Sequence, residues 1–155
     1  MIKSNTVPKS FSVDHTSMSA PQVRKAEVSS GPCGDVISKF DLRLIKPNTD
    51  ALPTAAVHTL EHLLATYMRE CLSGVIDLSP MGCRTGFYLL LWGDVKPDVV
   101  RQALIDSLRR ILSAKWEDVP GTSAESCGNY RDHSLFSAQE YARQILSELG
   151  EEQLG

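Results

Sequence analysis

The segment VHTLEHLLATYM, residues 57–68, is the part of the sequence that decides how the chain folds. In a helix of about 3.6 residues per turn, His58, Glu61 and His62 share one face, at spacings of three and four residues. A second face follows the spacing of core residues and carries Ala56, Leu60, Leu63, Leu64 and Tyr67. Two imidazoles four residues apart can bind one metal ion, and the order H-x-x-E-H is that of inverted zinc-peptidase sites. The segment therefore predicts a helix with one buried face and, on another face, side chains that could bind a metal ion.

The helix alone leaves several interpretations open. The histidines are ordinary surface side chains, or they belong to a small metallopeptidase in which Glu61 activates water and a downstream glutamate is the third ligand. A third alternative is a non-enzymatic binding module, whose structural metal would normally have four protein ligands. For the third ligand we favour Cys127, because the glycine after it lets the loop backbone approach a metal closely. Spacing does not choose between Cys127 and the competing residues Glu70, Glu117, Glu125 and His133.

The composition is that of an ordinary globular protein. The 155 residues suit a single domain, with 42% hydrophobic and 23% charged residues. A net charge of −3 does not suggest nucleic acid or a membrane surface as a partner. We find no signal peptide and no run long enough to span a bilayer, so we expect a cytoplasmic protein. In that reducing compartment Cys33, Cys71, Cys83 and Cys127, which lack C-x-x-C spacing, are not expected to form disulfides.

Three segments have the pattern of strands. In KFDLRL, residues 39–44, the apolar side chains alternate with Lys39, Asp41 and Arg43, which predicts one buried face and one solvated face, as at the edge of a sheet. VIDLSP (75–80) is typical of a short strand, and GFYLLLW (86–92) of a buried one. The MGC between these two strands places Cys83 at a strand edge or in a turn. The first 30 residues are expected to be irregular.

Two further helices follow the strands. Thr54 is a suitable N-cap for the histidine helix, which should end near Gly74. Pro97 can begin a second helix, and Ser137 with Glu140 forms a capping box for a third. The inward faces of the two later helices are Val100, Ala103, Leu104, Leu108, Ile111 and Leu112, and then Tyr141, Ile145, Leu146 and Leu149. Because strands and helices occur without regular βαβ alternation, we predict an α+β fold rather than a Rossmann-type sheet.

Five separated motifs give the chain a family resemblance. They occur in order across residues 10 to 135, as SFSVDHT, KFDLRL, HTLEHLLA, SPMGCRTGFYL and CGNYRDHSL. Together they resemble the S-ribosylhomocysteine lyases, bacterial enzymes that make the precursor of autoinducer-2. The resemblance implies a single domain over residues 1–155, an antiparallel sheet packed with helices, and a homodimer with active sites at the subunit interface. It also implies the substrate S-ribosylhomocysteine, which is cleaved to homocysteine and 4,5-dihydroxypentane-2,3-dione.

The resemblance assigns roles to particular residues. It implies Fe(II), replaceable by zinc or cobalt, held by His58, His62 and Cys127. It makes Cys83 and Glu61 the residues that transfer protons. Substrate-contacting positions of the family correspond to Ser10, His15 and Arg43, and less directly to Lys39 and Asp77. These assignments leave Cys33 and Cys71 without a role.

Cys83 can act as a base only as a thiolate, and a nearby cation or metal ion lowers the pKa of a thiol. We expect Arg43 or the metal to supply this charge, rather than Arg84, which would point to the opposite face of an extended segment. Because the N-terminal arm has little reason to fold over its own helix, we also expect His15 and Arg43 to come from one subunit. The metal and Cys83 would then come from the other subunit.

Overall fold

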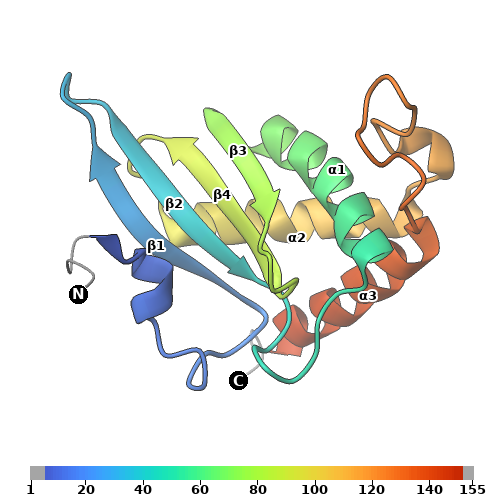
Figure 1. Cartoon of the computed structure of the whole chain (residues 1–155), viewed down its shortest axis with the longest axis horizontal. Helices are drawn as coiled ribbons and strands as arrows, with labels where there is room; N and C mark the ends of the chain where they lie inside the picture. The colour runs from blue at the N-terminus through green and yellow to red at the C-terminus, as the bar shows by residue number, and fades with distance from the viewer. Residues whose placement is uncertain (1–5, 152–155) are drawn as a thin grey trace.

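The computed structural model describes residues 6–151 (Figure 1). Its elements, in chain order, are η2 (Lys9–Ser12), β1 (Gln22–Ser30), β2 (Val36–Arg43), α1 (Thr54–Cys71), β3 (Val75–Pro80), β4 (Gly86–Trp92), α2 (Pro97–Ser113), η3 (Trp116–Asp118) and α3 (Leu135–Glu151). No helix within residues 6–151 combines the length and the apolar character that crossing a membrane requires.

The four strands form one antiparallel sheet in the order β1-β2-β4-β3. The three α-helices lie on one side of this sheet: α2 crosses behind the strands, and α1 packs beside β3 (Figure 1). The short helix η2 lies at the other side, near β1 and β2 (Figure 1). The predicted α+β class and antiparallel sheet are therefore confirmed.

One hydrophobic core joins the sheet to the three helices α1, α2 and α3. The strands contribute buried residues at alternate positions, such as Phe40 and Leu42 in β2 and Leu89 and Leu91 in β4. The predicted core face of α1 is also buried: Ala56, Leu60, Leu63, Leu64 and Tyr67. A single shared core agrees with one domain. The predicted domain also includes residues 1–5 and 152–155, which lie outside the described part of the chain.

Strand β1 was not predicted, because the first 30 residues carried no clear pattern. It pairs with β2 along most of its length, with a register shift between Lys25 and Glu27. None of its nine residues is fully buried, and Val23 is the β1 side chain that packs against the core. When the neighbouring strand supplies most of the contacts with the core, a strand needs few apolar residues of its own. Its sequence then shows little alternation of apolar and polar residues.

Two predicted helix caps are wrong. Thr54 is the first residue of α1 rather than its cap, and the preceding Pro53 makes no side-chain capping bond. In α3 the cap is Ser134, whose Oγ accepts a hydrogen bond from the backbone N–H of Ser137 at 3.2 Å. The helix therefore starts a turn before the predicted capping box. Helix α1 ends at Cys71, and Gly74, with φ +74°, lies in the turn that follows, close to the predicted end.

The prediction that 39–44 is a solvated sheet edge is also wrong. Strand β2 lies between β1 and β4, so it is interior to the sheet. Asp41 and Arg43 point away from the hydrophobic core, yet they are only 1% and 2% exposed. Residues of the N-terminal segment line a cavity with Arg43 on this side of the sheet. The buried charge of Arg43 on the outer face thus belongs to this cavity.

Candidate active site

The first region is a cluster around α1, where two ring orientations are fixed by backbone carbonyls. Nδ1 of His58 lies 2.8 Å from the carbonyl oxygen of Asp132, and Nδ1 of His62 lies 2.6 Å from that of Pro120. Because a carbonyl only accepts, each Nδ1 carries the proton and each Nε2 keeps a lone pair. Sγ of Cys127 lies 3.4 Å from Nε2 of His58. Two ligands of a tetrahedral zinc ion lie about 3.5 Å apart, so this spacing fits a shared metal.

Gly121 allows the loop to approach His62 this closely. Its φ is +69°, and a Cβ at this position would lie 2.9 Å from Cε1 and 3.0 Å from Nδ1 of the His62 ring. A larger residue would therefore displace either the ring or the loop. The loop thus contributes to the position of His62 through the carbonyl of Pro120 and through the lack of a side chain at the next residue.

His133 also joins the cluster, and Thr59 sets its orientation. The Thr59 hydroxyl donates to the carbonyl of Ala55 at 2.9 Å, so its oxygen accepts from Nδ1 of His133 at 3.0 Å and from the backbone N–H of Ser134 at 3.0 Å. Nε2 of His133 is buried and has no hydrogen-bond partner among the described residues. Burial and then the neighbouring imidazoles lower the pKa of His133 to about 4, so the ring is neutral at pH 7. A buried lone pair without a partner in this position also fits a metal ion.

The atoms able to bind a metal lie within 4.8 Å of one another in four residues: His58, His62, Cys127 and His133. This set contains none of the glutamates considered as a third ligand, and Glu70 instead pairs with Arg110 at 2.6 Å. The structure brings His133 to the cluster beside Cys127 rather than in its place. Imidazole and thiolate together suit zinc and iron, so the cluster could hold such an ion. The absence of a downstream glutamate from the set gives no support to a peptidase site.

Glu61 stands beside this cluster, as the H-x-x-E-H spacing predicts. Its Oε2 lies 3.5 Å from Nε2 of His62, and its side chain is 27% exposed. The carboxylate therefore lies beside Nε2 of His62, the nitrogen with the lone pair. A group bound at the cluster would lie near this carboxylate. The role of Glu61 in proton transfer stays a prediction.

The second region is a cavity of about 510 Å³ at the ends of β2 and β4, a volume in the range of small-molecule sites. Four residues singled out from the sequence line it together: Ser10, His15, Arg43 and Cys83. Thr85 and Tyr88 line it as well, and sequence reasoning gave neither a role. His15 is held by a contact of 2.8 Å between its Nδ1 and the carbonyl oxygen of Val13.

Arg43 is fixed in this cavity by a buried charge network. Its Nε and Nη2 donate to the two carboxylate oxygens of Asp41 at 3.1 and 2.7 Å. Arg24, directly opposite Asp41 in the β1–β2 register, donates to the same carboxylate at 3.0 Å. The remaining Nη1 of Arg43 donates to Oγ1 of Thr85 at 2.7 Å and lies 3.9 Å from Sγ of Cys83. Sequence reasoning did not find Asp41 or Arg24, because their pairing depends on strand register.

Cys83 lies in the turn between β3 and β4, as predicted, and its thiol is made more acidic there. Burial acts to raise the pKa of Cys83, but the hydrogen bonds with Thr85 and the charge of Arg43 outweigh it and lower the pKa below the ordinary value. Arg84 contributes through neither route. Its φ is +60°, so the segment is not extended as predicted, and its Nη1 donates to the carbonyl of Leu52 at 3.0 Å.

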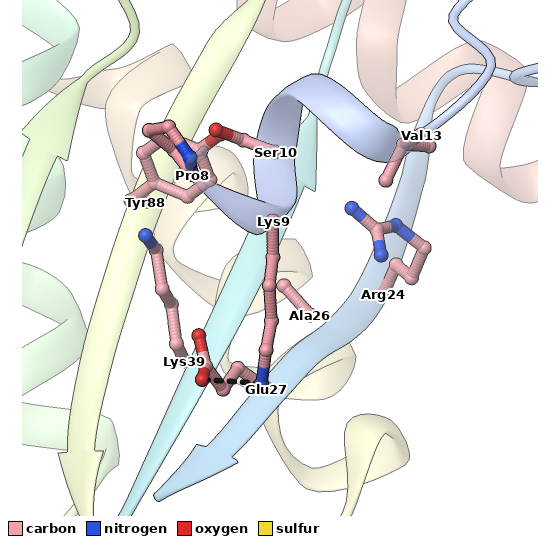
Figure 2. Close-up of a pocket in the computed structure, with 9 residues that line it drawn as sticks. All are labelled: Pro8, Lys9, Ser10, Val13, Arg24, Ala26, Glu27, Lys39 and Tyr88. Carbon is pink, nitrogen blue, oxygen red and sulfur yellow. Dashed lines mark hydrogen bonds and ion pairs between the residues drawn. The ribbon is translucent and has the colours of Figure 1, made fainter. Parts of the chain in front are cut away.

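Two predicted substrate-binding residues lie outside the cavity. Lys39 lines a smaller adjoining pocket, of about 180 Å³, in which its ammonium lies 4.3 Å from the centroid of the Tyr88 ring (Figure 2). Ser10 and Tyr88 line both pockets. Asp77 is exposed on the edge strand β3, where it accepts a hydrogen bond from the hydroxyl of Ser79. The roles of Lys39 and Asp77 therefore stay predictions.

The two regions share no residue among those described: the cluster involves α1 and the loop before α3, and the cavity involves the N-terminal segment and the sheet. The expectation that Cys83 and Arg43 come from different subunits is wrong, because their side chains lie 3.9 Å apart in one chain. The same cavity includes His15, so the N-terminal segment does fold over its own sheet.

The fold and these two regions define a class of protein. An antiparallel α+β domain that combines an imidazole–thiol cluster with a cavity around an acidified thiol and a buried arginine has the parts of a metal-dependent enzyme that moves protons. A non-enzymatic module with only a structural metal would not account for the cavity.

Comparison with known proteins identifies the family. The model of the S-ribosylhomocysteinase (LuxS) family matches residues 8–154, and the chain belongs to this family. It is 56% identical over 140 residues to S-ribosylhomocysteine lyase of Ligilactobacillus salivarius, covering 90% of each chain. It is 59% identical to S-ribosylhomocysteine lyase 1 of Lactobacillus delbrueckii subsp. bulgaricus, over 89% of this chain and 87% of that one. With S-ribosylhomocysteine lyase of Streptococcus sanguinis it shares 53% identity, over 92% of this chain and 89% of that one.

Proposed function

We propose that this protein is a metal-dependent lyase that cleaves S-ribosyl-L-homocysteine to L-homocysteine and 4,5-dihydroxypentane-2,3-dione, the precursor of autoinducer-2. Residues 1–155 act as one lyase domain, in a cytoplasmic homodimer that serves the activated methyl cycle and quorum sensing. Relatives named S-ribosylhomocysteine lyase support this function over about nine-tenths of the chain. The observation that carries it is the thiol of Cys83, which has a lowered pKa and lies beside the buried Arg43 in a cavity.

The reaction needs a group that can take up and return a proton repeatedly. Sulfur at C5 of the sugar can leave only after the adjacent carbon becomes acidic, so the carbonyl must move from C1 to C2 and then to C3. Each move removes a proton from one carbon and delivers one to its neighbour, before β-elimination expels homocysteine. A side chain does this best when its pKa lies near the working pH. The lowered pKa of Cys83 brings its thiol closer to that range.

Glu61 and the cluster act on the oxygens of the sugar. Glu61 transfers protons between hydroxyl groups, a role that its place beside His62 supports. We assign His58, His62 and Cys127 as ligands of one Fe(II) per subunit, which zinc or cobalt can replace. When bound, the metal supplies a Lewis acid that stabilises negative charge on the sugar oxygens.

The substrate is held by polar groups of the cavity and its neighbourhood. Ser10, His15 and Arg43 bind it within the cavity, and the guanidinium of Arg43 can hold its carboxylate. Lys39, from the adjoining pocket, and Asp77 complete the set. Because the cavity and the cluster share no residue in one chain, we assign the complete active site to the dimer, with the cavity of one subunit facing the cluster of its partner.

An anaerobic assay tests the function. The purified protein is loaded with Fe(II) and incubated with S-ribosylhomocysteine, and released homocysteine is measured with a thiol reagent. We expect stoichiometric release of thiol and formation of the dione. A correctly folded, metal-loaded protein that released no homocysteine would refute the assignment.

A further inference from the structure

Thr85 is a polar side chain of the cavity to which the mechanism above gives no role. It lies directly before β4, two residues after Cys83, and it is only 4% exposed. Its hydroxyl oxygen lies 2.7 Å from Nη1 of Arg43 and 3.1 Å from Sγ of Cys83. Thr85 therefore stands between the buried cation and the reactive sulfur.

The direction of these two hydrogen bonds follows from their donors. A guanidinium has only N–H donors, so Arg43 must donate and Thr85 must accept. The single hydroxyl proton of Thr85 is not used by that bond and is available to Sγ of Cys83. A hydrogen bond given to a thiolate is charge-assisted, whereas one given to a neutral thiol is weak. The arrangement therefore favours the ionised form of Cys83.

The charges behind Thr85 favour the same form. Asp41 is the carboxylate that pairs with both Arg43 and Arg24, at 2.7 and 3.0 Å. One negative and two positive charges leave this network with an excess of one positive charge, which a thiolate at Cys83 would neutralise. Arg43 itself is 3.9 Å from the sulfur, farther than Thr85, so the hydroxyl forms the shorter link between the network and the thiol.

Other polar groups line the same cavity as Cys83. The N-terminal segment contributes His15 and Ser10, β2 contributes Arg43, and β4 contributes Tyr88. Sγ of Cys83 lies 3.1 Å from Oγ1 of Thr85 and 3.9 Å from Nη1 of Arg43, so the contact with Thr85 is the shorter of the two. Among the influences that lower the pKa of Cys83, the side-chain bond with Thr85 comes first and the charge of Arg43 comes after it.

We propose that Thr85 is a positioning residue that holds Cys83 as a thiolate, by donating its hydroxyl proton to Sγ while it accepts a hydrogen bond from Arg43. The task of this thiolate in catalysis rests on the function proposed above. The protonation of Cys83 can be measured without substrate, so the two proposals can fail separately.

The test compares three substitutions at this position: Thr85→Val, Thr85→Ser and Thr85→Ala. Valine keeps the shape and loses the hydroxyl, serine keeps the hydroxyl and loses the methyl group, and alanine loses both. The metal-loaded full-length proteins are alkylated with iodoacetamide over a range of pH, and peptide mass spectrometry follows the rate at Cys83. The exposed thiol of Cys33, alkylated in the same samples, is the internal control. Circular dichroism and metal analysis check that fold and metal content match the wild type.

We expect Thr85→Val and Thr85→Ala to shift the midpoint of the Cys83 profile upward by about one to two pH units, as for one lost hydrogen bond to a charged group. Thr85→Ser should stay close to the wild type, and the rates at Cys33 should not change. If Thr85→Val does not fold, the comparison of serine with alanine decides. Equal midpoints with and without the hydroxyl would overturn the proposal, whatever the lyase assay shows. Failure of the wild-type lyase assay would instead refute the function and leave the result for Thr85 standing.

Discussion

The cluster around α1 and the cavity around Cys83 position their reactive groups by different means. In the cluster, carbonyl groups of the loop before α3 orient His58 and His62. In the cavity, the side chains of Asp41 and Thr85 orient Arg43. A backbone carbonyl stays in place when the side chain of its residue changes, whereas a network of side chains loses a link with each substitution.

This difference separates what can be measured at each region. Changes at the cluster should alter metal content, and changes in the cavity should alter proton transfer while the metal stays bound. If the complete site forms between two subunits, defects in the two regions should also complement each other across the dimer.

The largest effect is expected for Cys127→Ser. Replacing a thiolate ligand by a hydroxyl should weaken metal binding by more than about 100-fold, beyond the effect of changing a group behind a ligand. Lyase activity should fall with the metal. Metal analysis after dialysis against a chelator measures the loss, with Cys71→Ser on the exposed face of α1 as a matched control. Full occupancy in Cys127→Ser would show that another residue is the third ligand.

Cys83→Ala should affect the reaction and spare the metal. Removal of a general base typically costs about two to four orders of magnitude in rate, and we expect a loss of this size in kcat. Metal content should equal that of the wild type, because Cys83 is not part of the cluster. A Cys83→Ala protein that had lost its metal would contradict the separation of the two regions.

Glu61→Gln should also retain the metal, since the amide keeps the size of the side chain. Proton transfer between sugar hydroxyls should slow by about 100-fold or more, and a ketone intermediate should accumulate. Incubation with substrate followed by NMR would detect this species, and metal analysis of the same sample is the control. Loss of metal here would make Glu61 a ligand.

Mixing two inactive variants tests the dimer. With Cys127→Ser and Cys83→Ala, one of the two sites in each mixed dimer has a wild-type cavity and a wild-type cluster, so about a quarter of all sites should regain activity after random exchange. Mixing Cys83→Ala with Arg43→Ala should recover none, because these residues line the same cavity. No recovery in the first mixture, with exchange of subunits verified, would rule out this arrangement, and so would recovery in the second.

The smallest effect is expected for His133→Ala. With His58, His62 and Cys127 as the ligands, His133 is a neighbour, and its loss should weaken metal binding by about 10-fold to 100-fold at most. Competition with a chelator of known affinity measures this, alongside Cys127→Ser. An effect as large as that of Cys127→Ser would make His133 a fourth ligand and the site a closed, structural one.

The sequence predicts the cluster better than the cavity for a physical reason. His58, Glu61 and His62 lie within two turns of one helix, so local periodicity places them on one face. His133 could be considered from its nearness to Cys127 in the chain, but the hydrogen bond that orients its ring is donated to the hydroxyl oxygen of Thr59, 74 residues away.

The cavity depends on strand register, which local patterns do not contain. Asp41 and Arg43 alternate with apolar residues as on a solvated strand, and only the pairing of β1 with β2 brings Arg24 opposite Asp41. The contact between Arg43 and Cys83 likewise requires β4 beside β2. Strand β1 itself was missed because it has no fully buried residue. Family motifs identified Arg43 and Cys83 without explaining their contact.

The close approach of Pro120 and Gly121 to His62 has a consequence for protein engineering. A designer who grafted H-x-x-E-H onto the helix of another scaffold would transfer two imidazoles whose rings were free to rotate. In this protein the rings are held by the carbonyls of Pro120 and Asp132, and only a residue without a side chain fits at position 121. The smallest portable unit is therefore the helix together with the loop that covers it, and Pro-Gly belongs in the graft although it supplies no ligand.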